Sequence, residues 1–285
     1  MKSKHFEFLF HPIKLGKSLA LLSIFTIYFA TQSSLANTEI TTDVVSIKYI
    51  HGWKDNNGDI LGAIQFKLSP GWKTYWRNPG PFGIKPTFDW TSSQNIRKVE
   101  LSWPTPKIFQ QYDVKVIGYQ NVLTIPIKII KMFPLQHALL NINLEFGVCA
   151  DICLLKTAKI STPLQFKAPQ ENFDLITTAL KEVPSKTTDK VFFSSKCSIE
   201  INDDDLSIEY LIHLSKVPKS KPEMLIEYAF SDDYTENLTV KLEGKKLSVK
   251  TSLQNIYSNH KVIERNRLTA LLILEDSGFV ITGCD

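Results

Sequence analysis

The amino-acid sequence predicts an all-β protein made of two β-sandwich domains, joined by a short helix and a linker. Three observations lead to this prediction. Short segments of alternating polar and apolar residues, bounded by Pro, Gly or Asn, recur in both halves of the chain. Helical spacing of apolar residues is found in one short segment, after Pro169. The four cysteines are divided evenly between the two halves.

The first half of the chain is expected to be a series of strands. Val44–Ile50 and Ile60–Leu68 flank Asp55–Asp59, whose Asn and Gly residues tolerate the positive φ of a hairpin turn. Strands of similar length and spacing are typical of a β-sandwich, so we expect residues 37–168 to form the first domain. Its further strands are expected at Trp72–Trp76, Val99–Trp103, Val122–Ile130, Leu139–Phe146 and Leu154–Phe166.

The pattern changes after Pro169. Phe173, Ile176, Leu180 and Val183 recur at helical spacing, which predicts one short helix and then a linker over residues 169–190. Strand patterns return from Val191, so a second, smaller sandwich is expected over residues 191–285. Its strands are expected at Lys196–Ile201, Leu206–Leu214, Glu223–Phe230, Leu238–Leu242, Leu247–Thr251, Leu268–Leu274 and Phe279–Gly283.

The N-terminus has the features of a secretory signal peptide. Lys14 and Lys17 precede the apolar run Ser18–Ala30, and Ser34 and Ala36 place small residues before a cleavage point after residue 36. The alternative is an uncleaved membrane anchor, but the run is shorter than the roughly 20 apolar residues of a spanning helix. We therefore expect residues 1–36 to be removed and the mature chain to be a soluble protein of a bacterial periplasm.

Charge excludes one class of function. The formal net charge is +4, and it falls to about +1 when the lysine-rich signal peptide is removed. The mature chain has no cluster of Lys and Arg residues that would attract a phosphate backbone. No nucleic-acid partner is expected.

The four cysteines indicate disulfides, because their number is even and the chain is exported. Three pairings are possible, and the domain division favours Cys149 with Cys153 and Cys197 with Cys284. In the loop-entropy description the second bridge closes roughly 88 residues and stabilises by about 4.6 kcal/mol, against about 2 kcal/mol for the first. We therefore expect Cys197–Cys284 to be a structural disulfide that ties the first strand of the second sandwich to its last.

Cys149 and Cys153 are expected at the tip of a hairpin, where another protein's thiolate can reach them. The spacing alone leaves two interpretations open: the pair is redox-active, or its disulfide only stabilises the hairpin. A zinc site is not expected, because the histidines of the mature chain show no ligand spacing with these cysteines. Those histidines are His51, His137, His213 and His260.

Several motifs, in order along the chain, resemble those of one family. They are Pro70–Gly80, Phe88–Trp90, Trp103–Pro104, Ile117–Tyr119 and Phe146–Cys153. This sequence resembles the periplasmic N-terminal domain of the thiol:disulfide interchange protein DsbD, most closely in the ScsB (suppressor of copper sensitivity) branch. The resemblance covers residues 40–170 closely. It implies an immunoglobulin-like domain whose cysteine pair passes electrons from a membrane partner to periplasmic proteins, beneath a cap loop that carries an aromatic residue.

The resemblance also implies roles for individual residues. Cys149 and Cys153 match the redox pair, Tyr75 matches the tyrosine beside it, and Phe109 to Tyr112 fall where the cap loop is expected. Asp151 lies between the cysteines, where it either accepts a proton or is an exposed turn residue. The chain departs from the family in two ways. Three residues separate its cysteines, where the typical domain has five, and the membrane-spanning and thioredoxin-like segments are absent from it.

Two functions follow from these expectations. In the first, the protein is a thiol:disulfide oxidoreductase of the protein-disulfide reductase type, which supports cytochrome c biogenesis or copper tolerance and needs no cofactor. Its expected partners are a membrane-embedded thiol–disulfide electron donor and periplasmic thioredoxin-fold or disulfide-bearing proteins. In the second, the protein is a binding or adaptor module in which both disulfides are structural. The sequence does not decide which cysteine is attacked first.

Overall fold

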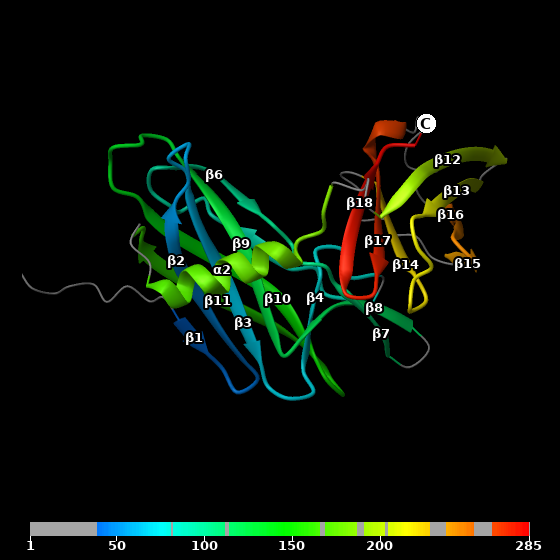
Figure 1. Ribbon diagram of the computed structural model, residues 1–285. Coiled ribbons are helices and arrows are strands. Elements are labelled where there is room, and N and C mark those ends of the chain that lie inside the picture. Colours follow the sequence, from blue (N-terminus) through cyan, green and yellow to red (C-terminus); the bar gives the residue numbers. More distant parts are fainter. Residues whose placement is uncertain are drawn as a thin grey trace, which may run out of the picture. The chain divides into compact units, whose positions relative to one another are not determined.

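The computed structural model (Figure 1) describes residues 39–80, 82–111, 114–165, 169–186, 191–202, 205–228, 238–253 and 264–284. Within these ranges the chain folds into antiparallel sheets with a single α-helix, which confirms the all-β prediction. None of the described helices is long and apolar enough to cross a membrane. The signal peptide predicted over residues 1–36 lies outside the described residues.

The first sheet of the first sandwich begins with the predicted hairpin. Asp55 turns the chain, because its Oδ1 accepts hydrogen bonds from the backbone N–H groups of Asn57 and Asp59. Gly58 supplies a positive φ of 82° there. The sheet has the strand order β1-β2-β3-β9-β6. These strands are β1 (Glu39–Thr41), β2 (Val45–Lys54), β3 (Ile60–Leu68), β9 (Val122–Lys131) and β6 (Ile96–Leu101).

The second sheet has the order β11-β10-β4-β8-β7, and the short strand β5 also pairs with β10. Its longest ladder is the hairpin of β10 and β11, which pair continuously from Leu139↔Pro163 to Cys149↔Cys153. The strands are β4 (Lys73–Tyr75), β5 (Thr87–Asp89), β7 (Lys107–Gln111), β8 (Val114–Gln120), β10 (Leu139–Cys149) and β11 (Cys153–Pro163).

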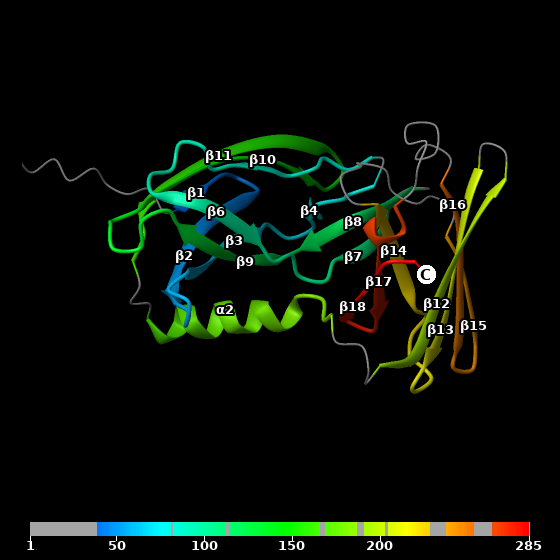
Figure 2. The same cartoon turned by 90° about the horizontal axis from the view of Figure 1, so that it is seen from above.

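Alternate residues of the facing strands fill the core between these two sheets, as period-two side-chain alternation requires. Phe66 and Phe146 meet edge to face with ring centroids 5.4 Å apart. Trp76 is fully buried, and Trp103 stacks on Tyr119, whose hydroxyl donates to the carbonyl oxygen of Pro104 at 2.8 Å. Seen from above, the β10–β11 sheet, the β2–β3–β9 sheet and the helix form three successive layers (Figure 2).

The helix α2 (Gln170–Glu182) covers the outer face of the first sheet. It begins after Pro169, a residue that is tolerated at a helix start because it needs no hydrogen-bond partner for a backbone N–H. Ile176 is fully buried and packs against Ile50 and Ala63 of the sheet. Of the other apolar residues at helical spacing, Phe173 is 43% exposed with its ring against Trp53, and Leu180 is 37% exposed.

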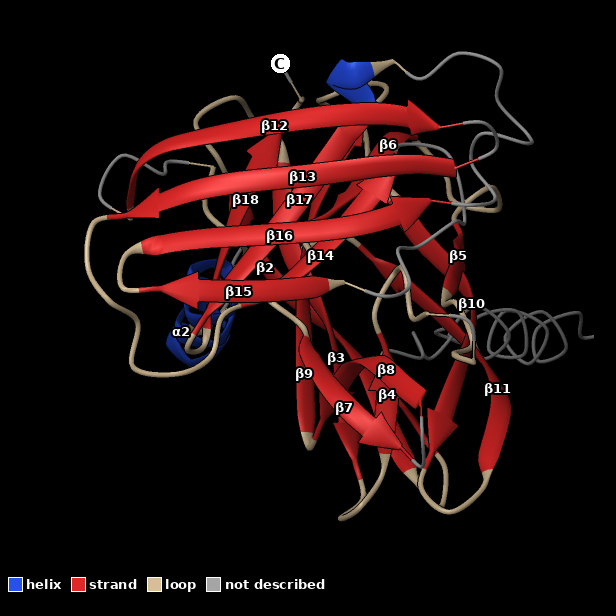
Figure 3. Cartoon of the chain, turned by 90° about the vertical axis from the view of Figure 1, so that its right-hand side faces the viewer, coloured by secondary structure: helices blue, strands red, loops and turns tan. Residues whose placement is uncertain are grey.

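The second sandwich also has two sheets and its own core. Figure 3 shows its four-stranded sheet side by side in the order β12-β13-β16-β15. The other sheet is β14-β17-β18. The strands are β12 (Phe192–Asn202), β13 (Asp205–Leu214), β14 (Glu223–Tyr228), β15 (Thr239–Glu243), β16 (Lys246–Leu253), β17 (Leu268–Leu274) and β18 (Ser277–Thr282), and a 3-10 helix, η1 (Arg265–Arg267), precedes β17.

The sheet of β14 and β17 buries both of its faces. Met224 and Leu272 belong to the core of the second sandwich, whereas Leu225, Leu271 and Ile273 pack with the core of the first. This explains why Leu268–Leu274 is an almost continuous apolar run rather than an alternating one. The two sandwiches are therefore in apolar contact, and residues 37–285 form one compact unit.

Phe109, which was expected in a cap loop, lies in strand β7 and pairs with Val116 of β8, and its shielding role stays a prediction. The mixture of β-branched, aromatic and Gln residues over Lys107–Gln111 suits a half-buried strand. Strands β1 and β5 were also not expected, because each has only three residues and shows no resolvable alternation.

Candidate redox site

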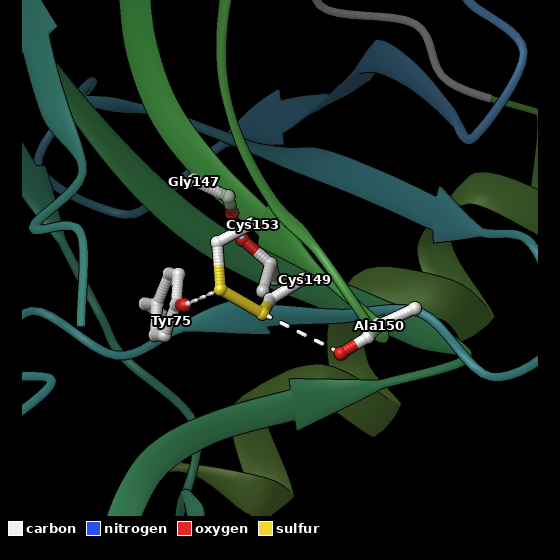
Figure 4. Close-up of a disulfide and its surroundings, with 6 residues drawn as sticks. Tyr75, Gly147, Cys149, Ala150 and Cys153 are labelled. Carbon is white, nitrogen blue, oxygen red and sulfur yellow. Dashed lines mark hydrogen bonds between the residues drawn. A yellow bond between two sulfur atoms is a disulfide. The ribbon is translucent and has the colours of Figure 1, made fainter. Parts of the chain in front are cut away.

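The candidate site lies at the tip of the β10–β11 hairpin (Figure 4). Cys149 ends β10, Cys153 begins β11, and the two residues are the last pair of the ladder. The turn between them is closed by a hydrogen bond of 3.0 Å from the N–H of Ala150 to the carbonyl oxygen of Ile152. A disulfide joins Cys149 to Cys153, as the domain division favours.

The two cysteines differ sharply in exposure. Cys149 is 1% exposed and packs with Tyr75, Val116 and Ile84, whereas Cys153 is exposed. An incoming thiolate must reach sulfur through solvent, so the exposed sulfur of Cys153 is the accessible one. Ile152 and Leu155 beside it are 61% and 56% exposed, and they place apolar surface next to this sulfur.

Strand β4 brings Tyr75 to the disulfide. Thr74 is paired with Val148 and Lys73 with Cys149, and the Thr74 hydroxyl donates to the carbonyl oxygen of Gly147 at 2.8 Å. This pairing fixes the strand so that the Tyr75 hydroxyl donates to the Cys153 sulfur at 3.4 Å. Figure 4 shows the ring pointing its oxygen at that sulfur. Burial raises the pKa of the Tyr75 hydroxyl, so the group keeps its proton and remains a donor at neutral pH.

The Tyr75 ring lies against the backbone of Gly147. A Cβ at this position would lie 2.6 Å from Cε2 of the ring and 2.5 Å from Cβ of Ile84. Real side chains do not approach so closely, so glycine is needed for the ring to reach the sulfur. The sequence carries a weak signal of this contact, since Gly147 interrupts the alternating pattern of β10.

The buried sulfur also has a polar neighbour. The Cys149 sulfur lies 3.7 Å from the carbonyl oxygen of Ala150 (Figure 4). A disulfide sulfur carries no hydrogen, so this contact is not a hydrogen bond in the oxidised protein. After reduction the Cys149 thiol would have this oxygen as an acceptor, whereas the Cys153 sulfur would have Tyr75 as a donor.

Phe109 lies on the disulfide's side of the sheet. It is paired with Val116, which packs against Cys149, and its ring centroid lies 5.5 Å from the ammonium of Lys73. Lys73 is itself paired with Cys149 across β4 and β10. Lys73 and Val116 therefore each have a relation both to Phe109 and to Cys149.

The other residues proposed for the site are placed differently. Asp151 is exposed in the turn between the two cysteines. Tyr112 lies outside the described residues. Sequence reasoning did not single out Lys73, Ile84 or Gly147. Lys73 is placed at the site by the register of β4 against β10, and Ile84 by tertiary packing against Gly147 and Cys149.

The remaining cysteines form the second predicted disulfide. Cys197 of β12 is joined to Cys284, which follows β18 and is 4% exposed. The bond links the two sheets of the second sandwich within its core. This position suits the structural role expected from the sequence, and that role stays a prediction.

The sequence of the first sandwich is similar to that of one known protein family. Residues 50–165 match the family model described as thiol:disulfide interchange protein DsbD, N-terminal. The match confirms the resemblance seen in the motifs, and it covers the whole β10–β11 hairpin tip and β4 of this DsbD-like sandwich. A search of the curated proteins gave no match.

A solved structure extends the likeness to both sandwiches. The crystal structure of the N-terminal periplasmic domain of ScsB from Proteus mirabilis superposes with a TM-score of 0.70 at 21% sequence identity. The alignment covers 87% of this chain and 97% of that one, so it reaches well beyond the DsbD-like sandwich. At this identity the likeness establishes the fold, which is an all-β, immunoglobulin-like arrangement.

Proposed function

We propose that this protein is a periplasmic thiol–disulfide exchange module that passes electrons through Cys149 and Cys153. Its donor would be a membrane redox partner, and its acceptors would be periplasmic substrate proteins. The observation that carries the proposal is the asymmetry of the disulfide, with one sulfur buried and the other exposed and hydrogen-bonded by Tyr75. The family match supports a role in thiol–disulfide interchange.

Reduction of the module would proceed in two exchange steps. A donor thiolate attacks the exposed Cys153 sulfur, so a donor–Cys153 disulfide forms and Cys149 leaves as a thiolate, which takes up a proton. The second thiolate of the donor then attacks the donor's own sulfur in that mixed disulfide. The donor departs with an internal disulfide, and Cys153 is released as a thiolate that accepts the hydrogen bond of Tyr75. Two electrons have moved from the donor to the module.

Oxidation of the module reverses these steps on a different protein. The Cys153 thiolate attacks an acceptor disulfide, and one acceptor sulfur leaves as a thiolate. Cys149, held beside Cys153 by the hairpin ladder, then attacks the Cys153 sulfur and releases the second acceptor sulfur. The disulfide is restored and the acceptor is reduced. The cysteines supply the chemistry themselves, and the roles proposed for Tyr75 and Phe109 are to support and shield them.

A trapping experiment tests the proposal. A Cys149→Ser variant keeps the exposed Cys153 sulfur and loses the residue that resolves the mixed disulfide, so we expect it to accumulate disulfide-linked partners in the periplasm. A Cys153→Ser variant keeps only the buried sulfur and should trap far less. A Cys149→Ser/Cys153→Ser double variant measures the background from the other cysteines.

The reduction potential separates the proposal from the adaptor alternative. A working carrier is expected between about −180 and −270 mV, whereas a structural disulfide lies below about −300 mV. A reduction potential below about −300 mV, together with equal trapping by the two single variants, would show that the Cys149–Cys153 disulfide only stabilises the hairpin. Cytochrome c biogenesis and copper tolerance are the processes in which trapped partners would be sought first.

A further inference from the structure

The loop between β9 and β10 exposes three large apolar side chains in succession. Met132 is 55% exposed, Phe133 is 53% exposed and Leu135 is 101% exposed. We call residues 132–138 the apolar loop. Scattered exposed apolar residues are common on protein surfaces, but a contiguous group at the end of a domain marks an interaction site.

The backbone of the apolar loop is tied down from inside. Asn95 shares its side-chain amide among the carbonyl oxygens of Phe133, Gln136 and His137, at 2.9, 3.2 and 3.0 Å. Its Oδ1 accepts the N–H of Phe133 at 2.7 Å. The Lys131 ammonium lies beneath the loop and donates to the carbonyl oxygens of Pro134 and Gln136. The loop therefore turns its polar backbone inward and its apolar side chains outward.

This arrangement fits a lipid surface better than a protein pocket. A segment that enters a hydrocarbon phase must satisfy its own backbone polar groups, because the lipid offers no partners. Asn95 and Lys131 meet much of this requirement, because they donate to the carbonyl oxygens of Phe133, Pro134, Gln136 and His137. It is also a tip rather than a groove, so it needs no shaped partner.

Positive charge accompanies the apolar tip. Lys54 lies close enough to Lys131 to influence its ammonium, and Arg97 is exposed beside the pair formed by Ile96 and Lys131. Asp55 and Asp59, in the β2–β3 turn at the same end of the sheet, are paired with Lys128. Basic residues around exposed apolar residues favour a bilayer that contains anionic lipid.

The loop lies at the far end of the DsbD-like sandwich from the cysteines. Strand β10 starts at Leu139, directly after the loop, and ends at Cys149, so its 11 residues separate the two (Figure 1).

We propose that the apolar loop inserts Phe133, Leu135 and Met132 into the interface of an anionic phospholipid bilayer. The contact holds the protein at the membrane surface with the cysteine pair directed away from the lipid. This inference does not depend on the redox chemistry of the pair.

Vesicle flotation tests it. Protein recovered from the periplasm, with its processed N-terminus verified, is mixed with vesicles of phosphatidylethanolamine and phosphatidylglycerol. We expect the wild type to float with the vesicles, and a Phe133→Ser/Leu135→Ser variant to bind about tenfold less or weaker still. A Leu211→Ser/Val217→Ser variant, which removes apolar residues of similar exposure from the second sandwich, should bind like the wild type.

A second variant tests the role of the hydrogen bonds between Asn95 and the backbone of the apolar loop. Asn95→Gly keeps all three apolar side chains and tolerates the positive φ of 56° at this position, but it removes the side-chain bonds to the loop. We expect an intermediate loss of vesicle binding with an unchanged melting temperature of the core. Failure of the wild type to float, or equal binding by the two double-Ser variants, would overturn the inference. Loss of a protein partner by the loop variant, without vesicle binding by the wild type, would overturn it as well.

Discussion

The Tyr75 hydroxyl lies 3.4 Å from the exposed sulfur of the pair, and the residues that hold it there are all structural. Thr74 fixes the strand, and Gly147 leaves room for the ring. A hydroxyl in this position stabilises negative charge on sulfur and so favours the thiolate of Cys153. At the scale of single residues, the two cysteines have different surroundings, since Cys149 is buried and Cys153 is exposed and receives the hydrogen bond of Tyr75.

Replacing Tyr75 with Phe isolates this hydrogen bond. We expect the pKa of the Cys153 thiol in the reduced protein to rise, because a hydrogen bond that favours the charged form is lost. The thiolate fraction near neutral pH should fall, and the higher nucleophilicity of the remaining thiolate offsets part of this loss, so alkylation slows by about threefold at most. Thiolate absorbance across a pH titration and the alkylation rate measure the two effects.

The matched control is Tyr210→Phe. Tyr210 is buried in the second core, and its hydroxyl has no hydrogen-bond partner there. Its loss should leave both the thiol pKa and the alkylation rate unchanged. An unchanged pKa in Tyr75→Phe would mean that Tyr75 only packs against the disulfide.

Among the elements, the β7–β8 hairpin is the candidate cover of the site. Phe109 is half-buried on the disulfide's side of the sheet, over Lys73. If it shields the reduced pair, Phe109→Ala should raise the rate at which a small reagent alkylates Cys149, with a loss of unfolding free energy well below the 3 to 5 kcal/mol of a buried aromatic. Mass spectrometry of the alkylated peptides distinguishes Cys149 from Cys153. A large loss of stability with an unchanged rate would make Phe109 an ordinary core residue.

Elements that carry their own periodicity could be predicted from the sequence, and elements defined by long-range pairing could not. The strands of the β2–β3 and β10–β11 hairpins are nine or more residues long and β10 alternates over most of its length, and the hairpins are bounded by Asn, Gly or Cys, so their positions could be predicted. The contact of Tyr75 with Gly147 depends on the register of β4 against β10, two strands that are far apart in the sequence. Local patterns do not encode that register.

At the scale of the whole molecule, the sheet of β14 and β17 links the two sandwiches. Leu225, Leu271 and Ile273 pack with the first core, although they belong to strands of the second sandwich. Arg77, two residues after Tyr75, is hydrogen-bonded to the Glu227 carboxylate of β14 at 3.2 Å. Destabilisation of the second sandwich can therefore affect the region of the cysteine pair through these contacts.

Removing the Cys197–Cys284 disulfide is expected to destabilise the second sandwich selectively. The bond closes a loop of roughly 88 residues, so its loss should lower the unfolding free energy by about 4 to 5 kcal/mol in the loop-entropy description. A Cys197→Ser/Cys284→Ser double variant removes the bond without leaving a free thiol. We expect a clearly lower melting temperature by calorimetry, because an ordered link between the two sheets of the second core is lost.

The same double variant separates a structural disulfide from a second redox centre. Below its melting temperature the first core and the β10–β11 hairpin keep their own contacts, so thiol–disulfide exchange at Cys149 and Cys153 should proceed within about twofold of the wild-type rate. The rate is measured with a small dithiol reductant on folded protein, and circular dichroism verifies the fold in the same sample. Loss of exchange in a variant that remains folded would contradict the prediction that the Cys197–Cys284 bond only stabilises the second sandwich.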